Sequence, residues 1–172
     1  MSEKGKAYLR TRWEYGERPV ASAKMNGWDD RIAYALELAY RLINEAFGGG
    51  DGALGDALDG LQVVALTPPA PAVKVLPGYA FISGMPFAME EAVELLPVVA
   101  PSADQRIDLV QARLSDWTYV IKEGEEDAAP PPPDADEDCL PLALLHLRVG
   151  MASIKNSDDG VNGYIEDARV LF

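Results

Sequence analysis

The chain has 172 residues, of which 48% are hydrophobic, so it can bury the core of one ordinary domain and is not expected to be disordered as a whole. Its formal net charge of −13 argues against binding to nucleic acid or to an anionic membrane surface, because both need clustered lysine and arginine. No apolar run is long enough to span a membrane, and the N-terminus lacks the apolar core of a signal peptide. We therefore expect a protein that stays in the cytoplasm unless it leaves as part of a larger particle.

Residues 1–28 show no sustained hydrophobic period, and we expect an extended N-terminal segment there. Trp13, Tyr15 and Trp28 are large anchors in a stretch that is otherwise polar and interrupted by glycine and proline. Such a segment cannot form a core of its own, so we expect it to lie on another surface. That surface belongs either to the same chain or to a neighbouring subunit.

Residues 29–47 form the clearest predicted helix. Asn26 or Asp29 can cap its N-terminus, and the three glycines at 48–50 end it. Its polar residues fall on a stripe that is narrower than the polar face of an ordinary surface helix. The extra apolar surface predicts burial on two sides, against the rest of the chain and against a neighbouring copy, or else burial deep within its own monomer. The residues expected at an oligomer interface are Trp13, Trp28, Ile32, Leu36, Ala39, Ile43 and Phe47.

Residues 48–60 are rich in glycine and aspartate, which predicts a flexible linker between the helix and the remainder of the chain. Aspartates beside glycines can also indicate a calcium or phosphate site. The spacing here matches neither an EF-hand loop nor a phosphate-binding P-loop, so the linker is the preferred interpretation.

Residues 61–172 have the period of β-strands separated by turn residues, and they predict a β domain. Residues 106–114 alternate well and can form a hairpin with residues 117–122. The expected fold is mainly β with one N-terminal α-helix, built as an antiparallel β-sandwich or a barrel-like domain. The expected strands cover residues 61–66, 73–76, 79–83, 93–96, 106–114, 117–122, 140–149, 153–154 and 164–170.

Residues 124–138 form an acidic, proline-rich loop within this β domain. Four consecutive prolines cannot donate the hydrogen bonds of a β-ladder and favour polyproline II geometry. We interpret the loop as a stiff connection between strands, with a docking site for a proline-recognition domain as the alternative. The aspartates within residues 134–138 can offer oxygen ligands to a cation, but a solvated acidic loop is the preferred interpretation.

The sequence offers little for catalysis. His146 is the only histidine and lies in a predicted strand, so a small hydrolase would have to act through it. Cys139 is the only cysteine and is expected to be a small buried thiol. We predict no catalytic residue, no metal site and no cofactor. Three aromatic residues, Trp117, Tyr119 and Tyr164, either contact a glycan or pack in the core and across strands.

Two short runs alternate charged and apolar residues. Residues 106–108 place an arginine and an aspartate around an isoleucine that is expected to point inward, and residues 167–169 repeat the pattern with aspartate and arginine exchanged. If the two strands are neighbours, a cross-strand pair of Asp108 with Arg169 would fix their register.

Five phrases occur in a fixed order in the second half of the chain, with the proline-rich loop before the fourth. They are V-x-V-x-P-G-x-A-x-I-x-G at residues 73–84, R-I-D-L-V at 106–110, W-x-x-x-x-K-E-G at 117–124, L-P-L-A at 140–143 and I-x-D-x-R-V at 165–170. This order resembles a domain found in the tail-fibre, baseplate and other tail structural proteins of bacteriophages and prophages. The preceding helix resembles the lead-in that such proteins place before this domain.

The resemblance implies a non-enzymatic structural or attachment part of a virus tail. Such a part is usually a homo-oligomer, most often a trimer, that binds other tail proteins and moves from the bacterial cytoplasm into the virion tail. The chain is short for a fibre and ends without a receptor-binding tip, which favours an adaptor, baseplate or attachment component, or a minimal fibre whose tip is another chain. A carbohydrate-binding β-sandwich for host-surface recognition is the alternative.

Overall fold

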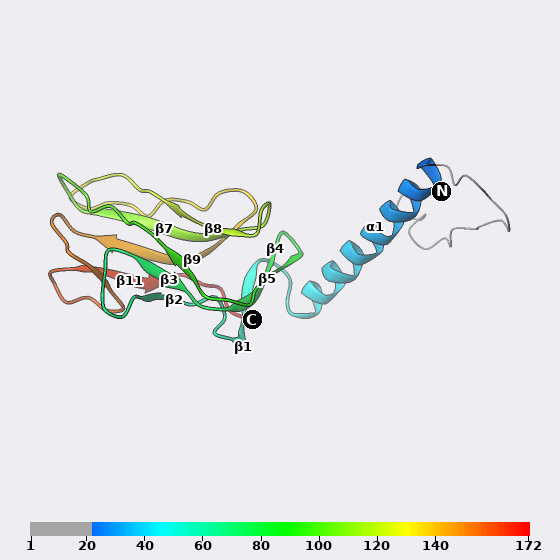
Figure 1. Ribbon diagram of the computed structural model, residues 1–172, viewed down its shortest axis with the longest axis horizontal. Helices are drawn as coiled ribbons and strands as arrows, with labels where there is room; N and C mark the ends of the chain where they lie inside the picture. Colours follow the sequence, from blue (N-terminus) through cyan, green and yellow to red (C-terminus); the bar gives the residue numbers. More distant parts are fainter. Residues whose placement is uncertain (1–21) are drawn as a thin grey trace. The chain divides into compact units, whose positions relative to one another are not determined.

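The computed structural model describes residues 22–172, which are drawn as the coloured ribbon in Figure 1. The predictions for residues 1–21, including the roles of Trp13 and Tyr15 as anchors, lie outside the described residues. The chain divides into two units, Met1–Gly49 and Gly50–Phe172, and each is described by itself.

The described part of the first unit is helix α1, Ser22–Ala46, which begins seven residues before the position predicted from the sequence. Asn26 and Asp29 therefore lie inside the helix, and the prediction that one of them caps it is wrong. The helix extends toward its N-terminus because the residues ahead of Asn26 are good helix formers, namely Ala23, Lys24 and Met25.

The C-terminal end of α1 lies within one residue of the predicted end. Gly48 and Gly49 have φ angles of 109° and 74°, in the left-handed region that glycine adopts without strain. The amide of Gly49 donates to the carbonyl of Asn44 at 3.0 Å, and the amide of Gly48 donates to the carbonyl of Glu45 at 3.1 Å. These bonds satisfy carbonyls that the end of a helix otherwise leaves without partners.

Strand β1, Gly52–Leu58, occupies most of the segment that the sequence predicted as a flexible linker. It pairs antiparallel with β4, Gly78–Ile82, and its residue Ala53 is fully buried. A side chain added at Gly52 would come within 2.7 Å of the Phe172 ring. The linker prediction was wrong because a glycine here permits close packing of a strand rather than flexibility.

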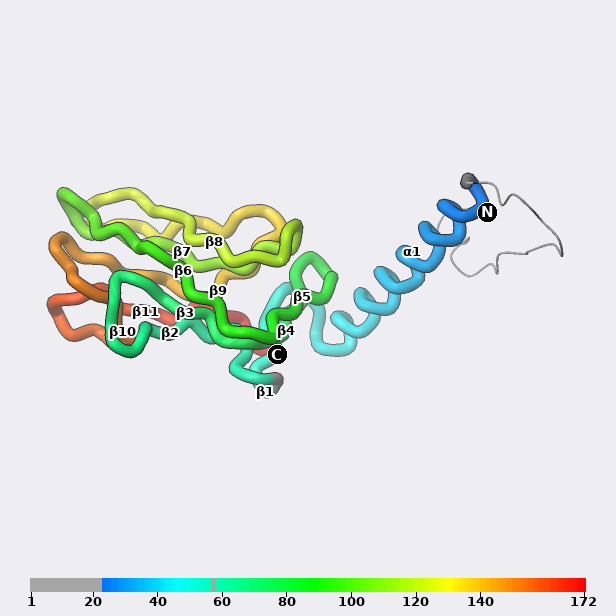
Figure 2. Tube along the Cα trace, viewed as in Figure 1, coloured from blue at the N-terminus to red at the C-terminus, as the bar shows by residue number. Residues whose placement is uncertain are grey.

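The C-terminus of the chain closes against β1. The amide of Ala53 donates to the carbonyl of Val170 at 2.8 Å, and the amide of Phe172 donates to the carbonyl of Ala53 at 3.0 Å. Figure 2 shows the last residues running beside β1. The two ends of the second unit are therefore held together by backbone hydrogen bonds.

The largest sheet has five strands in the order β10-β11-β9-β7-β8. Neighbouring strands are antiparallel, apart from the parallel pair of β10 and β11. The predicted hairpin is confirmed as β7 and β8, in which Leu109 lies opposite Lys122 and Arg113 lies opposite Thr118. The bounds are Arg106–Arg113 for β7, Thr118–Lys122 for β8, Cys139–Leu147 for β9, Ile154–Lys155 for β10 and Gly163–Asp167 for β11.

Two three-stranded antiparallel sheets complete the unit, in the orders β1-β4-β5 and β2-β3-β6. Strand β5 was not predicted because Pro86 interrupts its sequence pattern. It lies at the edge of its sheet, where a proline is tolerated because one side of the strand forms no ladder hydrogen bonds. The bounds are Val63–Ala65 for β2, Val73–Val75 for β3, Met85–Met89 for β5 and Val93–Leu95 for β6.

One apolar core joins the three sheets of this unit. Val73 and Val75 from β3 are fully buried, as are Val110 from β7 and Leu142 and Leu145 from β9. Burial of each such side chain stabilises the fold by roughly 1.5–3 kcal/mol. The fold is mainly β with one helix and resembles an antiparallel sandwich, as the sequence predicted, and it does not close into a barrel.

Strands β7 and β11 are not neighbours, because each of them pairs with β9. The predicted cross-strand pair of Asp108 with Arg169 is therefore wrong. Each charge pairs within its own run instead: Arg106 Nε donates to Asp108 at 2.7 Å, and Arg169 Nη2 donates to Asp167 at 2.6 Å. Arg106 and Asp108 are buried while Ile107 is only half-buried, so the expected inward isoleucine is also wrong.

Candidate functional site

A stripe of exposed apolar side chains runs along α1. Its large residues are 42–53% exposed, and its alanine is exposed as well. At about 100° per residue, an α-helix places all seven of its residues on one face. We call this surface the α1 stripe, and it consists of Met25, Trp28, Ile32, Leu36, Ala39, Ile43 and Phe47.

The α1 stripe contains every described residue that the sequence predicted at an oligomer interface. Met25 was missed, because the helix was expected to begin after it. Like positions in the stripe recur eleven residues apart, which corresponds to about 3.67 residues per turn and keeps the stripe on one face of a nearly straight helix. The like positions are Met25, Leu36 and Phe47, then Trp28 and Ala39, then Ile32 and Ile43.

Charged residues of opposite sign lie on the two flanks of the α1 stripe. By the same helical geometry, Lys24 and Arg31 lie on one flank, while Asp29 lies on the other. The polar face behind the stripe carries the ion pair of Glu37 with Arg41 at 2.7 Å. The helix therefore presents an apolar face with Lys24, Arg31 and the exposed Leu42 on one margin and Asp29 on the other.

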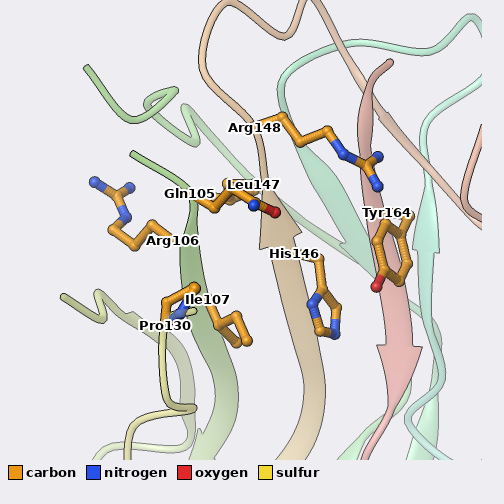
Figure 3. Close-up of a pocket in the computed structure, with 8 residues that line it drawn as sticks. All are labelled: Gln105, Arg106, Ile107, Pro130, His146, Leu147, Arg148 and Tyr164. Carbon is orange, nitrogen blue, oxygen red and sulfur yellow. The ribbon is translucent and has the colours of Figure 1, made fainter. Parts of the chain in front are cut away.

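A small polar pocket lies on β7, β9 and β11, with the proline-rich loop at one side (Figure 3). His146 and Tyr164 lie opposite each other on β9 and β11, and their rings stack at 4.4 Å and 2° between planes. His146 Nε2 forms a hydrogen bond with Glu166 Oε2 at 2.7 Å. The Arg148 guanidinium lies 5.3 Å from the centre of the Tyr164 ring and donates to Asp158 at 2.9 Å.

The groups around this pocket are already engaged with one another. His146 is hydrogen-bonded to Glu166 and stacked on Tyr164. Arg148 is hydrogen-bonded to Asp158 and lies over the ring of Tyr164. The pocket volume is about 90 Å³, well below the roughly 300–1,000 Å³ of ordinary small-molecule sites. This arrangement fixes the strands to each other.

The three aromatic residues considered for glycan contact do not form one platform. Tyr164 lies on β11, separated from β8 by β9 and β7. Tyr119 is only 9% exposed and packs edge-on against Phe87 at 5.9 Å, so its predicted role in glycan contact is wrong and packing decides its position. Trp117 is 47% exposed and stacks on Phe87 at 5.7 Å.

A buried ion pair supports the start of the proline-rich loop. Asp108 accepts from Arg106 Nε at 2.7 Å and from the amide of Gly124 at 3.1 Å. Arg106 Nη2 also donates to the carbonyl of Val99 at 2.9 Å. Burial acts to lower the pKa of Arg106, but the hydrogen bond and charge of Asp108 outweigh it, and the pKa is raised. The pair therefore has a structural role.

The acidic loop is anchored rather than open for a cation. Asp136 accepts hydrogen bonds from Lys122 Nζ at 2.6 Å and from the Gln111 amide, and these lower its pKa. Within residues 22–172, no group of three or more His, Cys, Asp or Glu side chains is placed to hold a metal ion. Cys139 is a buried free thiol, as predicted, and burial raises its pKa away from the reactive thiolate.

No helix in the described part of the chain is long and apolar enough to cross a bilayer. No family model, no curated protein and no solved structure matches the chain. Support for a function therefore comes from the residues and surfaces described above.

Proposed function

We propose that the chain is a non-enzymatic structural protein of a bacteriophage or prophage tail. It acts as an assembly or attachment module of the tail, baseplate or fibre, and it acts through packing between its own copies and other virion tail proteins. The single observation that carries this proposal is the α1 stripe. The ordered phrases of residues 73–170, which resemble those of tail proteins, supply the kind of particle.

The α1 stripe supports an assembly role because its apolar area is too regular to be incidental. Scattered exposed apolar residues are normal on a protein surface, whereas a contiguous patch marks an interaction site. The stripe continues over two full eleven-residue repeats, from Met25 to Phe47. A second copy of the same helix offers a matching surface along this whole length.

The flanks of the α1 stripe support copies that run parallel and in register. In a parallel ring of helices, the flank with Lys24 and Arg31 faces the flank with Asp29 on the next copy. An antiparallel arrangement would place like flanks against each other. The number of copies, three, rests on the resemblance to tail proteins.

Mass spectrometry of tail particles purified from a bacterium that carries the gene tests this proposal. We expect the chain in the particle fraction together with the other tail proteins. The variant Ile32→Ser/Leu36→Ser should be lost from that fraction, while the control Val149→Ser/Val161→Ser, which alters exposed valines of the second unit, should stay. Recovery of the unaltered chain only as free protein would contradict the proposal.

Trp117 favours the carbohydrate-binding alternative. Its φ angle of 55° lies in the left-handed region, which is strained for a bulky residue and is often retained for a function. The ring is half-exposed and is held by stacking on Phe87. A glycan screen checks this function: a specific glycan that binds the chain and is lost in Trp117→Ala supports it, whereas no bound glycan removes it.

A further inference from the structure

A groove lies where β6 and β8 approach each other in the second unit. Each is the last strand of its sheet and pairs with one neighbour among the described strands, β6 with β3 and β8 with β7. The groove has a volume of about 400 Å³. Its lining consists of residues 94–99, residues 119–121, Asp108 and Glu123.

The groove runs along the edge of β8 and extends over the adjoining face of the sheet as far as Asp108 on β7. Tyr119, Val120 and Ile121 all line it, although successive side chains of a strand point to opposite faces. Three consecutive residues can all line the groove only where it reaches the strand edge. The amide and carbonyl groups that β8 does not use toward β7 therefore face this groove.

The lining is apolar at its centre and acidic at its margin. Leu96 and Val99 are 64% and 60% exposed there. Tyr119 also lines the groove, and its buried hydroxyl has no hydrogen-bond partner within residues 22–172, which is rare for a buried polar group. Glu94 and Glu123 are exposed along the margin.

Proteins commonly guard a free strand edge with a lysine that repels added strands. The lysine of β8 does not guard this edge, because Lys122 Nζ is paired with Asp136 at 2.6 Å. The edge is also free of proline, which would remove a backbone donor. Neither of these two devices, a free lysine or a proline, therefore protects the edge of β8.

We propose that this groove binds an extended peptide segment of another protein, in which apolar side chains alternate with lysine or arginine, as a strand added to β8. The free edge supplies main-chain hydrogen bonds, which is how strand addition gains affinity. The exposed Leu96 and Val99 receive the apolar side chains. The margin with Glu94 and Glu123 selects basic residues by charge complementarity. The inference does not depend on the proposed role in a tail.

A synthetic peptide with the sequence Thr-Val-Arg-Val-Lys-Ile-Arg-Thr, blocked at both ends, tests the proposal against the full chain. Isothermal titration calorimetry should give a Kd of roughly 10–100 μM at low salt, the range of a short segment without preorganisation. A peptide with the basic residues replaced by glutamate should bind at least tenfold more weakly. A peptide with proline in place of the central valine should also lose binding, because it cannot complete the ladder.

Matched variants of the chain test whether the peptide binds in this groove. Glu94→Lys/Glu123→Lys should weaken binding of the basic peptide at least tenfold, whereas Glu90→Lys/Glu91→Lys, the same change of charge outside the lining, should leave it within threefold. Equal loss in both variants would show attraction to net charge alone and overturn the proposal. Undiminished binding of the proline peptide, or no saturable binding of the basic peptide at about 1 mM, would overturn it as well.

Discussion

At the scale of single residues, a buried ion pair matters more for the stability of the fold than an exposed one. Arg106 and Asp108 are both buried, and Asp108 also holds the amide of Gly124. Gly124 itself lies so close to the Ile107 carbonyl that a side chain there would collide with it. The pair and this glycine together fix where the proline-rich loop leaves the sheet.

Replacement of Asp108 by asparagine should destabilise the fold by about 3–5 kcal/mol, because the buried Arg106 guanidinium then keeps only the more distant carboxylate of Glu126, at 4.0 Å, as a counter-charge. Urea denaturation measures the loss. The exposed pair of Arg113 with Asp116 is the control, and Asp116→Asn should change the midpoint far less. Equal effects of the two substitutions would mean that burial does not increase the contribution of the Arg106 pair to stability.

The same exposed pair gives a pH prediction. The hydrogen bonds that Asp116 accepts from Arg113 and Thr118 lower its pKa to about 2. A lowered pKa in the folded state means that the contribution to stability is present above the unfolded value and is lost as pH falls toward the folded value. NMR titration should place the midpoint of Asp116 near the folded value and find it raised in Arg113→Ala. An unchanged midpoint in that variant would show that Arg113 does not lower the pKa of Asp116.

At the scale of elements, the sequence located the long strands β7, β8 and β9 well and missed β1 and β5. Strands β7, β8 and β9 alternate or are continuously apolar, so the pattern alone located them. Strands β1 and β5 were missed because Gly52 and Pro86 are turn signals unless their neighbours in space are known. The start of α1 was missed because Asp29 resembled a cap.

Gly52→Val should destabilise the second unit by about 1–3 kcal/mol, because the added side chain meets the Phe172 ring and forces β1 to shift. Thermal unfolding followed by circular dichroism measures the change. Gly27→Ala serves as the control: nothing lies within 4 Å of an added Cβ there, and the helix should gain up to about 1 kcal/mol. A neutral Gly52→Val would restore the flexible-linker interpretation of this segment.

The candidate sites also differ in how far the sequence predicts them. A helix stripe depends on local period, and six of the seven residues of the α1 stripe could be predicted from the sequence. A glycan platform depends on which strands are neighbours, and the sequence does not say that Tyr119 turns into the core or that Tyr164 lies three strands from Trp117. The groove beside β8 was not predicted for the same reason.

At the scale of the whole molecule, the proposed function depends on association of the chain with itself. Dispersed exposed apolar residues also occur on the second unit, as at Val149 and Val161. The α1 stripe differs from these residues because it is periodic. A parallel copy of the helix can therefore contact it along its full length. A net charge of −13 keeps the free chain soluble and confines attraction to surfaces with apolar area or opposite charge.

The central claim is that the α1 stripe joins three copies, and light scattering after size exclusion at micromolar concentration tests it most directly. The full chain should have three times the chain mass, and Ile32→Ser/Leu36→Ser/Ile43→Ser should reduce it to a monomer. The control Val149→Ser/Val161→Ser/Val170→Ser, which alters even more exposed apolar residues of the second unit, should remain trimeric. A monomeric full chain, or an oligomer unaffected by the α1 substitutions, would contradict the account.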